Sequence, residues 1–137
     1  MTNTAMTHND NLFAALVEQA PDAMIYADRE GTIRIWNRRA ETLFGHAAAD
    51  AVGQNLDLII PERLRAAHWQ GFHAAVASGQ TRHGGEALTT RSVHKNGDKL
   101  YVSMSFSLIK NAAGEVIGSL AIGRDVTAQQ LAAQSRK

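Results

Sequence analysis

The feature that most constrains the fold is a strictly alternating run that follows an Asn-Gly pair. Apolar residues alternate one by one with more polar ones in the order Leu100, Tyr101, Val102, Ser103, Met104, Ser105, Phe106, Ser107 and Leu108. A period of two predicts an antiparallel strand with only one buried face. Asn96-Gly97, just before this run, is a strong hairpin signal because both residues tolerate positive φ. We therefore expect a hairpin formed by strands 86–94 and 99–109.

The remaining elements follow from helical spacing, turn residues and caps. The predicted helices cover 11–20, which Pro21 ends, 47–52 and 61–78, and a further helix lies between its cap Asn37 and Gly45. The other predicted strands cover 23–27, 32–36 and 116–126, with Gly31 in the turn between the first two and Thr127 capping a helical tail. Runs of strands separated by a block of helices indicate an α+β domain with an antiparallel sheet.

Size and composition fit one globular domain. Of the 137 residues 45% are apolar and 20% charged, and no apolar run approaches the ~20 residues that a membrane span needs. We expect a flexible start over 1–11, the domain over 12–127 and a helical tail over 128–137, in the cytoplasm. Basic and acidic side chains are scattered along the chain, so neither direct nucleic acid binding nor membrane binding is expected. The absence of cysteine excludes disulfides, thiolate metal sites and a flavin attached to a thiol.

Several fragments together resemble the PAS family. They are Gly31 in the first hairpin, Trp36-Asn37 at the start of a helix, Lys95-Asn96-Gly97 in the later hairpin and Gly123-Arg124-Asp125-Val126-Thr127 at the end of the last strand. The resemblance covers residues 12–127, and the fragments occur in the family's order and at its spacing. It implies a five-stranded antiparallel sheet with several short helices packed on one face, flanking terminal helices, and a ligand pocket between sheet and helices.

A narrower resemblance concerns the segment around one histidine. Ile60-Pro61-Glu62, Arg65 and His68 resemble the segment that carries the proximal histidine in haem-binding PAS domains of oxygen-sensor kinases. The resemblance implies that His68 binds haem iron, and an imidazole from a helix is a usual haem ligand. Further along, those relatives carry an arginine where gapless counting places Leu88 in this chain. Met104 on the inward face of the next strand is a further candidate ligand, because histidine and methionine pair at haem iron.

The predicted ligand-binding residues combine the helix 61–78 with the inward sheet face. They are Leu64, His68, Trp69, Phe72, Leu88, Met104, Phe106 and Leu120. Three interpretations remain open: a haem-based sensor, a haem-free domain that binds a small organic molecule or flavin, and a dimerisation or docking domain whose core its own side chains fill. Without haem, His68 is a pocket residue bonded to backbone or water, and Met104 fills the core.

Nothing in the sequence indicates catalysis. His68 and His73 lie ~140° apart around a helix, so they do not converge on one metal ion. His83 and His94 occupy loop or hairpin positions, where we expect them to be solvated. The serines of the alternating strand lack the surroundings of an activated nucleophile. We therefore expect a domain that is not an enzyme.

The outer face of the sheet is the expected contact surface. We expect it to present Tyr101, the alternating serines and either Ile117 or Ala121, and its moderate polarity suits a non-obligate interface. A homodimer is therefore expected. A signalling partner protein or an output domain acting in trans would receive the signal through this face and the terminal helices.

Overall fold

The sheet of the computed structural model, which describes residues 8–136, has five antiparallel strands. They are β1 (Ala23–Asp28), β2 (Ile33–Trp36), β3 (Leu88–Val93), β4 (Lys99–Lys110) and β5 (Val116–Asp125). Their order across the sheet is β2-β1-β5-β4-β3, so the last strand lies at the centre. The two predicted hairpins, β1–β2 and β3–β4, are therefore confirmed.

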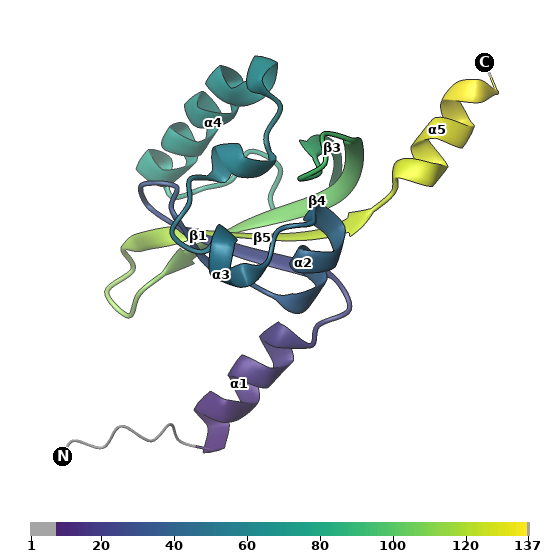
Figure 1. Cartoon of the computed structure of the whole chain (residues 1–137). Helices are drawn as coiled ribbons and strands as arrows, with labels where there is room; N and C mark the ends of the chain where they lie inside the picture. The colour runs from purple at the N-terminus through teal and green to yellow at the C-terminus, as the bar shows by residue number, and fades with distance from the viewer. Residues whose placement is uncertain (1–7, 137) are drawn as a thin grey trace.

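The helices fall into a block between β2 and β3 and two flanking helices. The block contains α2 (Arg38–Phe44), α3 (Ala48–Ala51), the 3-10 helices η1 (Leu56–Ile59) and η2 (Glu62–Leu64), and α4 (Arg65–Ser78). The flanking helices are α1 (His8–Glu18) and α5 (Thr127–Ser135), and Figure 1 shows that both project away from the body of the domain. No helix in residues 8–136 is both long and apolar enough to cross a membrane.

Two helix boundaries differ from expectation. The first helix begins at His8, before the predicted start at residue 11, and ends at Glu18; residues 1–7 lie outside the described part of the chain. The single helix expected over 61–78 is a 3-10 turn followed by an α-helix from Arg65. The Arg65 side chain donates hydrogen bonds to the carbonyls of Ile60 and Asp57, which ties the start of α4 back to η1.

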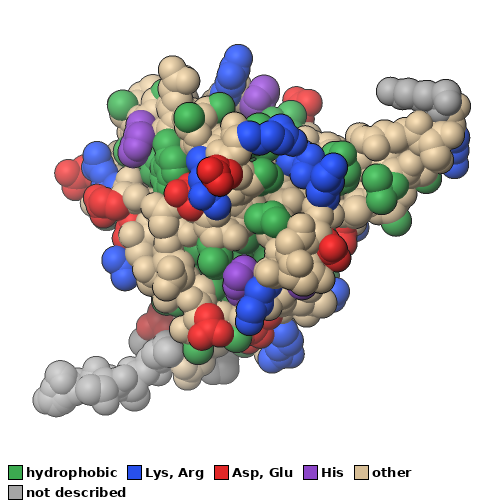
Figure 2. Space-filling model, turned by 45° about the horizontal axis from the view of Figure 1, so that its top comes forward, with side chains coloured by type: hydrophobic (Ala, Val, Ile, Leu, Met, Phe, Trp, Pro, Cys, Tyr) green, Lys and Arg blue, Asp and Glu red, His purple; other side chains and the backbone are tan. Residues whose placement is uncertain are grey.

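The core lies between one face of the sheet and the helical block. On β4 the buried positions are Leu100, Val102 and Met104, as the alternation predicted. Helices α2, α3 and η1 bury Phe44, Ala51 and Ile59 in the same cluster, and α4 adds the partly buried Trp69 and Phe72. Figure 2 shows basic and acidic side chains interspersed over the surface it presents, with α5 standing clear of the body.

Asn37 joins the first helix to the core through both ends of its amide group. Its Oδ1 accepts hydrogen bonds from the backbone N–H groups of Met24 and Ala40, at 2.9 and 3.0 Å, which caps α2 as predicted. Its Nδ2 donates to the carbonyls of Val17 and Asp22, at 2.8 and 3.1 Å. The residue is only 1% exposed; its bond to Ala40 is buried, and the other three bonds are partly buried. One side chain therefore fixes the exit of α1, the start of β1 and the start of α2.

The last helix is attached to the beginning of β4. Val126 donates its backbone N–H to the carbonyl of Tyr101, and the N–H of Tyr101 donates to the hydroxyl of Thr127. Gln134, farther along α5, donates to the phenolic oxygen of Tyr101 at 3.3 Å. A salt bridge of 2.9 Å between Arg124 and Asp22 then connects the end of β5 with the segment that follows α1. Both flanking helices are thus attached to neighbouring points of the sheet.

Candidate functional site

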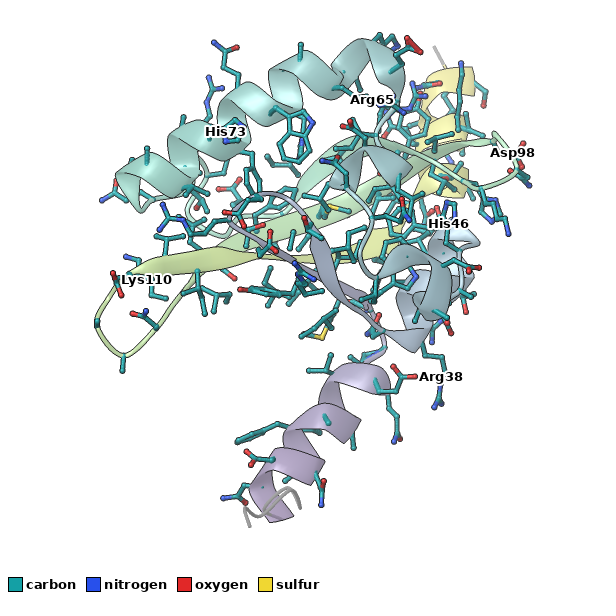
Figure 3. The ribbon with its side chains drawn as sticks, turned by 60° about the vertical axis from the view of Figure 1, so that its left-hand side comes forward. Arg38, His46, Arg65, His73, Asp98 and Lys110 are labelled. Atoms are coloured by element: carbon teal, nitrogen blue, oxygen red, sulfur yellow. The ribbon has the colours of Figure 1, made fainter. Side chains whose placement is uncertain are left out.

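The aromatic face of α4 is the candidate site that the sequence singled out. His68 and Trp69 have ring centroids 4.7 Å apart, and Phe72 lies 5.2 Å from Trp69 and 6.0 Å from His68. His73, which is exposed, stacks on Trp69 with 5.8 Å between the ring centroids. Figure 3 shows α4 lying along the sheet, with Arg65 at its start and His73 farther along. The four rings form one continuous cluster between solvent and the core.

Trp69 is the most firmly held member of this cluster. Its indole Nε1–H donates a hydrogen bond of 2.8 Å to the carboxylate of Asp57 on η1. Its ring packs directly over Gly31 in the β1–β2 turn, where any Cβ would collide with the indole. Gly31 also has φ of +84°, a left-handed conformation that glycine adopts without strain. The turn and the indole therefore require glycine at this position for two independent reasons.

His68 has an unused ring nitrogen. Its Nδ1 is buried and has no hydrogen-bond partner among the described residues. The pKa of His68 is lowered, chiefly because burial disfavours the imidazolium; His73 lowers it further, and the Asp57 carboxylate acts in the opposite direction. The side chain is therefore a neutral imidazole at neutral pH. A neutral imidazole with a free nitrogen is the form that binds a metal ion.

The strands place three of the predicted residues on the inner face. Leu88 of β3 pairs with Met104 of β4, so their side chains share one face, and Met104 is buried. Phe106 follows on the same face but is 37% exposed, and it lines a hollow beside the loop 79–85. Leu64 at the end of η2 is half-buried. These residues and the α4 rings lie on the helix-covered side of the sheet.

Leu120 does not belong to this group. It pairs with Tyr26 on β1 and with Ser107 on β4, which places its side chain on the outer face. Its neighbour Ala121 pairs with the buried Ile25 and is packed against the core, so of the two alternatives expected on the outer face, Ile117 and Ala121, the structure excludes Ala121. The error has one cause, because a shift of one residue along a strand moves a side chain to the opposite face.

The structure also contains hollows that the sequence did not indicate. One of about 480 Å³ lies at the end of the sheet near α2, and one of about 240 Å³ lies between the loop 79–85 and β4. Phe106 lines the smaller hollow, whereas His68, Trp69 and Met104 line neither. The larger one is built from five separate segments, so no local motif could have revealed it.

His94, which lines the larger hollow, is not solvated as expected. Its side chain is half-buried, its ring packs on Gly45 at the end of α2, and its Nδ1 accepts a hydrogen bond from the backbone N–H of Asn96 at 3.1 Å. The hairpin is bonded to the end of α2, because Lys95 donates its backbone N–H to the carbonyl of Phe44 at 2.9 Å. His83, in contrast, is exposed.

Comparison with known proteins establishes the family. The model of the PAS fold matches residues 11–126, which is most of the chain. The chain belongs to the PAS family. The PAS domain shares its fold with the solved PAS domain of a protein from Colwellia psychrerythraea, at a TM-score of 0.76 and 24% identity over 88% of this chain and 98% of that one.

Two curated relatives of this PAS domain are sensor proteins. The Oxygen sensor protein DosP of Escherichia coli is 27% identical over 120 residues, covering 88% of this chain and 15% of DosP. The Sensor protein FixL of Bradyrhizobium diazoefficiens is 34% identical over 64 residues, covering 47% of this chain and 13% of FixL. The chain therefore spans a small part of the length of either relative.

The residues of the α4 site are compatible with haem. His68 offers a neutral imidazole with a nitrogen that no other group uses, and the inner face around Leu88 and Met104 is apolar. Axial haem ligation requires such a nitrogen, and an apolar surrounding suits the porphyrin. Trp69 and Phe72 pack against the core in the same region, so a bound macrocycle would have to displace part of that packing.

Proposed function

We propose that this PAS domain is a non-catalytic sensory module that binds haem between α4 and the inner face of the sheet, with His68 as axial ligand. The observation that carries the proposal is the buried, unpartnered Nδ1 of a histidine whose pKa is lowered by burial. A buried polar atom without a partner costs about 1–3 kcal/mol, so a ligand for the imidazole would remove an existing deficit. The similarity to DosP, an oxygen sensor by name, supports the same function.

Each residue of the site would have a defined task. Haem would supply an iron atom that binds a diatomic gas or changes its redox state. His68 would hold the iron, and Leu88 and Met104 would keep water away from the macrocycle on the sheet side. Met104 also carries a thioether, a group that pairs with histidine at haem iron, and would be a candidate ligand beside His68. The pair formed by Trp69 and Asp57 would fix the position of η1 beside the helix.

The test is a titration of haem into three purified proteins. Wild type should bind haem with a sharp Soret band, and His68→Gln should lose that band or bind much more weakly. His73→Gln is the matched control, because His73 lies on the same helix, is exposed, and stacks on the outer side of Trp69. The proposal fails if wild type binds no haem, or if the two variants bind it equally well.

A second candidate function is dimerisation, which is favoured by the packed core around α4 and by exposed apolar side chains on α1. Trp69 and Phe72 are packed against the core, as expected of a domain that its own side chains fill. Phe13 and Leu16 on α1 are 60% and 58% exposed, although they are large and apolar. Such side chains on a projecting helix favour a homodimer in which α1 is covered by the partner. Light scattering on wild type and Leu16→Glu tests this: a dimer that becomes a monomer supports it, and a monomeric wild type contradicts it.

A haem-free pocket for a small organic molecule or flavin is the remaining alternative. Flavin would be bound without a covalent thiol bond, because the chain has no cysteine. It would give an absorption band in the blue that His68→Gln retains. In either case a ligand would signal only if it bound two arrangements of the domain with different affinity. The contacts of Asn37 and Tyr101 with the flanking helices would transmit the difference to a partner or output domain.

A further inference from the structure

The larger hollow lies where the connections to both flanking helices meet. Its walls are Pro21 and Asp22 after α1, Arg39, Thr42 and Leu43 of α2, His94 of the hairpin, Leu100 of β4, and Gly123, Arg124 and Asp125 at the end of β5. Its volume is about 480 Å³, which is within the range of small-molecule sites. The hollow is separate from the α4 site, so a ligand in the hollow can bind whether or not haem binds at α4.

The floor of the hollow is apolar. Leu43 and Leu100 belong to the buried core and expose only their edges to the hollow, and Gly123 adds backbone without a side chain. These groups offer a surface for the apolar part of a ligand, and hydration of that surface is lost when the ligand covers it. The polar groups lie around the floor, on α2 and at the end of β5.

The rim carries one guanidinium that has no partner. Arg39 makes no hydrogen bond and no ion pair within residues 8–136, whereas Arg124 is bonded to Asp22 at 2.9 Å. Asp125 accepts a hydrogen bond from the backbone N–H of Thr127, which engages its carboxylate with the start of α5. His94 accepts at Nδ1, so its neutral ring carries the proton on Nε2 and is a donor there. The α2 side of the rim thus presents donors that are not yet matched by acceptors.

We propose that this hollow binds a small organic carboxylate. The carboxylate is held by Arg39 and by Arg124, and the apolar part of the molecule covers Leu43 and Leu100. Planar guanidinium groups match a carboxylate with two parallel hydrogen bonds, which makes arginine the suitable receptor. Arg124 becomes available because its bond to Asp22 is exposed, with 66% of the Arg124 side chain accessible, and exposed ion pairs contribute little to stability.

Binding would change how the flanking helices are attached. Asp22 precedes β1 directly after α1, and Arg124 lies at the end of β5 just before α5. Their salt bridge is a direct link between the two connections, across 102 residues of sequence. A carboxylate that takes the place of Asp22 on Arg124 removes this side-chain link between the two connections, while Asn37 still holds the carbonyl of Asp22. The hollow would therefore couple a metabolite to the same helices that the α4 site is proposed to control.

The test uses para-fluorobenzoate as the probe, with binding followed by fluorine NMR and by the backbone amide signals of the protein. Para-fluorobenzyl alcohol is the probe control, because it has the same ring and no charge. Arg39→Gln should weaken binding of the carboxylate about tenfold, as expected for the loss of one charge-assisted contact. Arg38→Gln is the matched variant: Arg38 is the preceding residue, lies 3.8 Å from Glu18 of α1, and does not line the hollow (Figure 3).

Asp22→Asn provides a result of opposite sign. It removes the carboxylate that competes for Arg124, so the probe should bind a few-fold more tightly than to wild type. Addition of the probe should shift the backbone amide signals of residues 22 and 124. The proposal is supported by weaker binding to Arg39→Gln together with tighter binding to Asp22→Asn. It is overturned if Arg39→Gln binds like Arg38→Gln, if Asp22→Asn binds more weakly, or if the alcohol binds as well as the carboxylate.

Discussion

Replacement of Asn37 by alanine should be the most destabilising polar substitution in this domain. The change removes the cap of α2, which costs about 1 kcal/mol. It also leaves the N–H of Met24 and the carbonyls of Val17 and Asp22 without the bonds they make now, at 2.8 to 3.1 Å. Each buried group so deprived costs about 1–3 kcal/mol, reduced where water can enter. We therefore expect a loss of about 3 kcal/mol in the free energy of unfolding.

Urea denaturation followed by circular dichroism measures this loss. Asn55→Ala is the control, because Asn55 is also a helix cap but is exposed and makes one side-chain bond, to the N–H of Asp57 at 2.7 Å. It should lose about 1 kcal/mol or less. Asn37→Asp should lose at least as much as Asn37→Ala. The carboxylate keeps the acceptor for Met24 and Ala40, but it places a buried negative charge against two carbonyl oxygens to which it cannot donate.

The reasoning would be refuted if Asn37→Ala lost no more than Asn55→Ala. It would also be refuted if Asn37→Asp were as stable as wild type, because the two donated bonds would then contribute nothing. In either case Asn37 would not be the residue that ties α1 to the core, and the path proposed for the signal would have to run through other contacts.

Three further predictions concern the α4 region. Gly31→Ala should lose clearly more stability than Gly53→Ala in thermal unfolding. Both glycines have positive φ, but only at Gly31 would a Cβ collide with Trp69. Equal losses would contradict the packing of the indole on Gly31. Trp69→Phe should lose about 1–2 kcal/mol in urea denaturation because its bond to Asp57 disappears, and an unchanged midpoint would show that this bond does not matter. The lowered pKa of His68 means that the unfolded chain binds a proton more readily, so this residue's contribution to stability is present above pH ~6.5 and declines as the pH falls. The pH dependence of stability should therefore be less steep in His68→Phe, and an identical slope would refute the assignment.

Local signals in the sequence were sufficient for the fold. The alternation of β4 and the Asn96-Gly97 turn predicted one hairpin, and Gly31 predicted the other. These signals succeed because backbone conformation and the burial of one face are decided within a few residues. The face of Leu120 was predicted wrongly because it depends on the register of β5 against two neighbouring strands, which local signals do not determine.

The site could be predicted only in part. His68 was found from its place on a helical face and from its resemblance to known sensors, and its buried nitrogen is consistent with that choice. The role of Asp57 as partner of Trp69 could not be foreseen, since it depends on how η1 approaches α4. The hollow beside Arg39 was missed entirely, because its walls come from residues as far apart as Pro21 and Asp125.

The most direct test of the central proposal is the absorption spectrum of the domain purified from cells that are supplied with haem. We expect a Soret band whose intensity corresponds to about one haem per domain. The band should shift on reduction and again on addition of carbon monoxide, and it should be absent from His68→Ala. A colourless wild-type domain that stays colourless when haem is added would contradict the account, and the α4 rings would then be core packing alone.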